Sequence, residues 1–149
     1  MSEPLISGPH VQIATLCDMV VEDKTGAICV IRAIDRFTVV GNTAEMQPAQ
    51  IKTTMALCLK PDMAQHKASL KIQPVSPSGE QLPPGEMSIL FEGRERGVQL
   101  ILPMQLMLKE EGLYWFDILV DGQRLTRIPL RLIYQFVATG QNQSPQSND

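Results

Sequence analysis

The chain has 149 residues, of which 44% are hydrophobic, and a formal net charge of −3. This length fits a single domain that can build its own core. Acidic and basic residues are interspersed, so the dense basic surface that nucleic-acid binding requires is missing. No apolar run approaches the roughly 20 residues of a membrane-spanning helix, and the first ten residues show no signal-peptide pattern. We therefore expect a cytoplasmic protein with neither nucleic acid nor membrane as its partner.

The first predicted element is a β-hairpin. Apolar residues alternate along residues 11–21 as in a half-buried strand. Residues 22–26 supply a turn, and residues 27–40 return as a second strand with a bend or bulge near residues 33–36. The face of the first strand expected to point inward consists of Val11, Ile13, Cys17, Met19 and Val21.

The cleanest alternation lies between residues 50 and 60, after a linker at residues 41–48. It predicts a strand with one buried face, and residues 67–72 predict a shorter strand that Pro74 closes. The inward face of the longer strand consists of Ile51, Thr53, Met55, Leu57 and Leu59.

The proline-rich segment 74–85 reads as a long loop over one end of the domain. Residues 87–92 predict a strand, and residues 98–106 predict another. Pro103 lies inside the latter, and because proline cannot donate to a sheet ladder, this strand is expected at a sheet edge.

The last predicted hairpin has the clearest sequence signal. Residues 113–120 and 125–134 alternate on either side of Asp121 and Gly122, a strong turn signal, although the spacing suggests a loop longer than two residues. Residues 140–149 hold no apolar side chain able to dock and are expected to be disordered. The residues of this hairpin expected in the core are Tyr114, Phe116, Ile118, Val120, Ile128, Leu130 and Leu132.

These elements predict an all-β fold, an antiparallel two-sheet sandwich of about seven to nine strands, immunoglobulin-like in architecture. We place the domain at residues 10–139, with an N-terminal extension at 1–9 and a disordered tail at 140–149. Helical periodicity is almost absent.

Two sequence elements resemble a family of uncharacterised bacterial β-sandwich proteins, a domain of unknown function, over residues 11–134. A Gly-x-Tyr-x-Phe strand that ends in Val-Asp-Gly is also weakly similar to many immunoglobulin-like sandwiches. The resemblance implies the fold and a bacterial cytosolic origin, and it implies no activity, cofactor or site residue. The elements are Leu16-Cys17-Asp18 with Ile31-Arg32-Ala33-Ile34-Asp35-Arg36, and Gly112-Leu113-Tyr114-Trp115-Phe116 with Val120-Asp121-Gly122 and Ile128-Pro129-Leu130.

Residues able to carry catalysis are few. His10 and His66 are expected at the surface, outside any nucleophile motif, and phosphate-binding or dinucleotide-binding glycine motifs are missing. Cys17, Cys29 and Cys58 are isolated in sequence, as buried thiols of a reducing compartment are. Pairing of the first hairpin would make Cys17 and Cys29 diagonal neighbours, most simply as inert packing. We expect no enzyme, cofactor or metal site.

One sheet face has partner-binding character. Alternation places Trp115 on the opposite side from Tyr114 and Phe116, on a face too apolar for a solvated sheet. Either it binds a protein partner or a second copy of the chain, or residues 74–85 or 135–139 cover it. The predicted partner-binding residues are Leu113, Trp115, Leu119, Arg131 and Ile133.

The alternative hypothesis is a small-ligand binder or an enzyme, with a pocket built from loops 41–48, 74–85 and 93–97. The polar residues first suspected there are His66, Glu92, Arg94 and Glu95.

Overall fold

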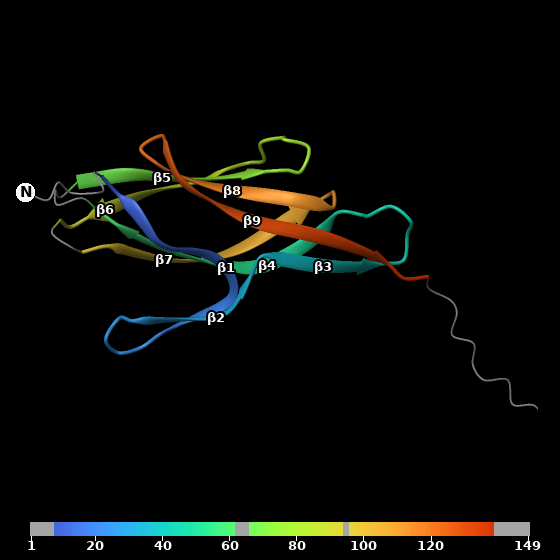
Figure 1. The fold of residues 1–149 in the computed structure, drawn as a ribbon, viewed down its shortest axis with the longest axis horizontal. Helices are drawn as coiled ribbons and strands as arrows, with labels where there is room; N and C mark the ends of the chain where they lie inside the picture. The colour runs from blue at the N-terminus through green and yellow to red at the C-terminus, as the bar shows by residue number, and fades with distance from the viewer. Residues whose placement is uncertain (1–7, 62–65, 94–95, 139–149) are drawn as a thin grey trace, which may run out of the picture.

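The computed structural model describes residues 8–61, 66–93 and 96–138, and in these residues the chain is all-β. It forms a four-stranded sheet, ordered β2-β1-β4-β7, packed on a five-stranded sheet, ordered β3-β9-β8-β5-β6 (Figure 1). The predicted immunoglobulin-like sandwich is confirmed. The predicted tail at 140–149 and residues 1–7 of the extension lie outside the described residues. The strands are β1 (His10–Glu22), β2 (Ile28–Ile34), β3 (Arg36–Gly41), β4 (Ala49–Lys60), β5 (His66–Val75), β6 (Gly85–Phe91), β7 (Val98–Leu108), β8 (Gly112–Val120) and β9 (Gln123–Phe136).

The core lies between the two sheets and consists of side chains at every second position. All the residues predicted to point inward from β4, β8 and β9 are buried. Tyr114 is among the largest of them, and its hydroxyl donates to the carbonyl oxygen of Glu110 at 2.6 Å. A buried hydroxyl needs such a partner. No helix occurs in the described ranges, hence none that is long and apolar enough to cross a membrane.

The β8–β9 hairpin is tighter than predicted. Val120 pairs with Gln123, so the loop has only two residues, Asp121 and Gly122. Their φ angles are 50° and 81°, as a type I′ turn requires. The Asp121 carboxylate also accepts a hydrogen bond of 2.9 Å from the backbone N–H of Ser69, which ties the turn to β5.

The predicted strand at 27–40 is wrong as a single element, whereas the bend predicted near residues 33–36 is confirmed. The chain leaves one sheet after Ile34, bends at Asp35 and enters the other sheet as β3. There β3 runs parallel to β9, with Phe37 beside Leu132. The inward-facing positions change phase at the bend, from Ile34 on β2 to Phe37 and Val39 on β3. Among the described strands, every pair other than β3 and β9 is antiparallel.

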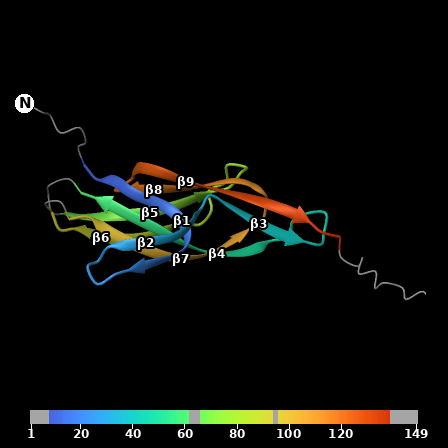
Figure 2. The same cartoon turned by 60° about the horizontal axis from the view of Figure 1, so that its bottom comes forward.

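The second half of β1 does not lie over the core. Residues 10–17 pair with β4, whereas residues 16–22 pair with β2. The chain therefore leaves the body as a two-stranded ribbon at residues 18–32, the β1–β2 arm (Figures 1 and 2). Met19 and Val21, predicted to point inward, are 51% and 45% exposed on this arm.

The three thiols are far from equivalent. Cys17 lies opposite Ala33 and Cys29 opposite Val21, so Cys17 and Cys29 are not diagonal neighbours as predicted. Cys17 and Cys58 are buried and Cys29 is exposed. Burial raises the pKa of the Cys17 thiol, with a further rise from the Asp18 charge. Burial also raises the pKa of Cys58, partly opposed by Lys60.

A thiol-reactive reagent tests this arrangement. Because the thiolate is the reacting form, Cys29 should react rapidly in the folded protein, and Cys17 and Cys58 only after unfolding. The unfolded thiols ionise from about pH 8.5, below the raised pKa values of the folded state, so the free energy of unfolding should fall as the pH rises above that point. Rapid labelling of two or three thiols at pH 7 would contradict the structure.

Candidate binding cleft between β6 and β7

The sandwich is open along one side. Strand β7 ends the four-stranded sheet and β6 ends the five-stranded sheet, so within residues 8–61, 66–93 and 96–138 neither has a neighbour beyond it. Between them lies a cleft of about 390 Å³.

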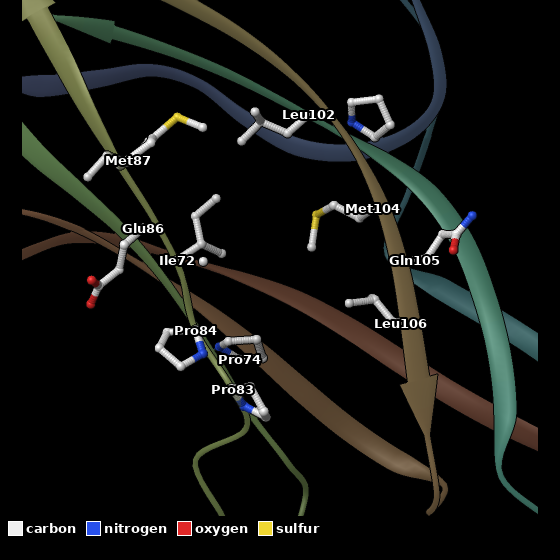
Figure 3. A pocket seen from close by; sticks show the side chains of 13 residues that line it. Ile72, Pro74, Pro83, Pro84, Glu86, Met87, Leu102, Met104, Gln105 and Leu106 are labelled. Atoms are coloured by element: carbon white, nitrogen blue, oxygen red, sulfur yellow. The ribbon is translucent and has the colours of Figure 1, made fainter.

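Apolar side chains line this cleft. Leu102, Met104 and Leu106 enter it from β7, Met87 enters it from β6, and Ile72 of β5 lies at its floor (Figure 3). All of these residues face inward. The three β7 residues Leu102, Met104 and Leu106 lie opposite Met55, Thr53 and Ile51 of β4, and Met87 lies opposite Leu70 of β5.

These β7 side chains are only half-buried, whereas Met55 and Ile51 of β4 are almost completely buried. The difference follows from the sheet order, because no described strand lies beyond β6 to cover β7. The cleft is thus an exposed part of the core. The polar side chains nearest to it, Glu86 and Gln105, point away from the apolar lining (Figure 3).

The two open strands differ in what they offer a partner. Pro103 lies in the middle of β7, opposite Thr54. Proline in a sheet is tolerated where its nitrogen faces away from the neighbouring strand, so β7 lacks a donor halfway along its open side. Strand β6 has no proline between Gly85 and Phe91. It can therefore offer an unbroken row of backbone groups.

Sequence reasoning found part of this site. The edge position of β7 was predicted from Pro103 and is confirmed. The cleft itself was missed, because it depends on which strand lies at the edge of the opposite sheet, and alternation within a strand does not reveal that order.

The Trp115 surface is assembled as predicted, on the outer face of β8 and β9. Trp115 lies opposite Pro129, and Leu113 opposite Arg131. Arg131 is exposed, and the predicted apolar residues Leu113, Trp115, Leu119 and Ile133 are half-buried.

The guanidinium carbon of Arg127 lies 4.7 Å from the centre of the Trp115 ring. Arg127 Nε also donates to Asp117 at 2.7 Å, so this arginine shields part of the surface. Partner binding through the Trp115 surface stays a prediction.

The histidines are half-buried, not at the surface as predicted. His10 Nδ1 is buried and has no hydrogen-bond partner in the described part of the chain. The ring centre of His66 lies 5.2 Å from that of Phe91. Among the described residues no three His, Cys, Asp or Glu side chains gather as metal ligands would.

The loops of the alternative pocket do not converge. Loops 41–48 and 74–85 lie toward one end of the sandwich, and the end of β6 and the start of β7 lie at the other (Figure 1). Glu92 pairs with Arg96 at 3.2 Å. Of the other suspected residues, Arg94 and Glu95 lie outside the described residues.

Comparison with known proteins shows the family to which the chain belongs. Residues 12–133 match a family of unknown function, DUF6941. The chain belongs to this family. This confirms the predicted resemblance to an uncharacterised family, and it assigns no activity. No curated protein matches the chain.

Two solved structures share broad similarity with this family member. One is an alkylpurine DNA glycosylase, AlkC, of Pseudomonas fluorescens, bound to DNA containing an abasic site analog; identity is 11%, the TM-score 0.44, and the match covers 85% of this chain and 31% of that one. The other is an immunoglobulin-like protein of Pseudomonas aeruginosa, with 13% identity, a TM-score of 0.38 and coverage of 87% and 99%. Similarity at this level carries no argument about function.

Two methionines provide a test of the open cleft. Met104 lies half-exposed in the cleft, and Met55 lies in the closed core. Met55→Ala should lower the free energy of unfolding by about 2–5 kcal/mol, and Met104→Ala by roughly 1 kcal/mol, because only the first leaves a sealed cavity. Chemical denaturation measures both. Equal losses would mean that the cleft is closed in solution.

Proposed function

We propose that this protein is a non-catalytic, cytoplasmic interaction module that takes up an extended apolar segment of a protein in the β6–β7 cleft. The observation that carries this proposal is the coincidence of two features. The outer edge of β6, which has no neighbouring strand in the described part of the chain, borders the cleft, and the cleft is lined by apolar side chains at every second position.

An added strand would satisfy both features. Pairing with β6 would supply backbone hydrogen bonds, and alternate side chains of the bound segment would enter the cleft, as in other strand-addition complexes. Side chains on its other face would stay in solvent beside Glu86 and Ser88. The recognised chemistry is therefore a β-strand with apolar residues at alternate positions.

Strand β6 is the better acceptor of the two. Pro103 breaks the row of donors along β7, so a segment lying between the strands would hydrogen-bond to β6 and contact β7 through side chains alone. This extends the five-stranded sheet by one strand. The half-exposed residues of β7 would then be covered.

Binding, and not catalysis, fits the chemistry of the cleft. Its apolar lining holds no histidine or cysteine, and Glu86 and Gln105 point away from it. A protein segment also fits the charge of the chain better than a polyanion does, because the net charge is −3.

Two substitutions on β6 test the proposal. Met87 points into the cleft and Leu90 lies on the other face of the same strand; they are 39% and 47% exposed. A fluorescent eight-residue peptide of alternating valine and threonine serves as the probe. Met87→Glu should weaken its binding at least tenfold, because a buried charge would face apolar side chains, whereas Leu90→Glu should change it little.

Both variants should keep the wild-type circular dichroism spectrum, since both side chains are already exposed. The measurement uses protein dilute enough to be monomeric. Failure of the monomeric wild type to bind the peptide, or equal losses in the two variants, would overturn the proposal.

A further inference from the structure

The β1–β2 arm has an apolar face that nothing in the described chain covers. Met19 lies opposite Ile31, and Val21 opposite Cys29, so the four side chains share one face of the ribbon. Ile31 is 42% exposed and Cys29 is exposed as well. A two-stranded ribbon on its own is at best marginally stable in water, and an exposed apolar face adds to that instability.

Among the described strands, β1 is the only neighbour of β2, so the outer side of β2 has no described partner. The same chain therefore holds an open apolar strand that projects from the body and an open strand beside an apolar cleft. Strands β2 and β6 each have seven residues.

We propose that the segment taken up in the β6–β7 cleft is strand β2 of a second copy of this chain. This inference rests on the proposed function and names its partner. The β1–β2 arm of one copy extends the five-stranded sheet of the other.

Alternation and charge select a register for this contact. In an antiparallel arrangement with Ile31 opposite Met87, Cys29 lies opposite Ile89, and the exposed face of the arm points to the cleft. Arg32 then lies opposite Glu86 of the other copy.

The two charges are available for this contact. The Arg32 side chain is 72% exposed and ion-paired with Asp18 at 2.9 Å, and Glu86 is exposed. Docking would place Arg32 between two carboxylates, a complementary arrangement that favours this register. Met19 and Val21 lie on β1, the strand next to β2 in the docked arm, and they face the half-buried side chains of β7 in the other copy.

Each copy has one arm and one cleft. Reciprocal exchange closes into a two-fold dimer, in which both arms are used. Each contact joins the arm of one copy to the cleft of the other, whereas a symmetric contact would join the two arms to each other.

A mixing experiment tests the inference. Ile31→Glu disables the arm and keeps the cleft, and Met87→Glu disables the cleft and keeps the arm. In reducing buffer, light scattering after size exclusion should give a dimer for the wild type and a monomer for each variant alone. An equimolar mixture should form a dimer again, since one intact arm meets one intact cleft. Val40→Glu, on an exposed residue of β3, is the control and should stay dimeric.

A charge exchange provides a second test. Arg32→Glu and Glu86→Arg should each shift the protein toward monomer, and both changes in one chain should restore the dimer. Loss of self-association in the single variants without restoration in the double variant would overturn the proposed register.

Other outcomes separate the two proposals. A wild-type monomer at every concentration, together with peptide binding, overturns this inference and leaves the proposed function intact. A Met87→Glu variant that stays dimeric on its own indicates an arm-to-arm contact, and variants that stay monomeric when mixed show that an intact arm does not bind an intact cleft; either result overturns this inference. If Ile31→Glu is monomeric and fails to bind the peptide, the proposed function itself fails.

Discussion

Incomplete coverage of one edge strand is the constraint on which this account depends. Strand β7 has apolar side chains at every second position along its inner face, and it forms the end of its sheet, as Pro103 predicted. The opposite sheet ends at β6 and leaves Leu102, Met104 and Leu106 half-exposed. A soluble protein normally protects such an edge. Here Pro103 protects β7 against strand pairing, while the neighbouring β6 stays unblocked.

Local patterning predicted most of the core. Side chains of a strand alternate between faces, so one inward residue such as Tyr114 or Leu57 assigns the rest of its strand. The type I′ turn at Asp121 and Gly122 then brings β8 and β9 into register. These features depend on a few neighbouring residues, which is why they can be read from the sequence.

Features that depend on distant pairing were not predictable in the same way. The crossing at Asp35 and the departure of Met19 and Val21 from the body both follow from which strand lies beside β1 and β3. Alternation is identical in a strand that covers the core and in a ribbon that leaves it. The candidate site has the same origin: Pro103 marked an edge, but the cleft requires two edges from different sheets. The Trp115 surface, by contrast, was assembled correctly because it lies within one hairpin.

Hydrogen exchange of the β6 amides is the most direct measurement of the open edge. In dilute monomeric protein, the amides of residues 85–91 that face away from β5 should exchange much faster than those of β8, which has a neighbour on each side. Saturation with a bound strand should slow them selectively. Amides of β6 that are all as protected as those of β8 in the free monomer would show that the edge is already covered, and the cleft would then not be a binding site.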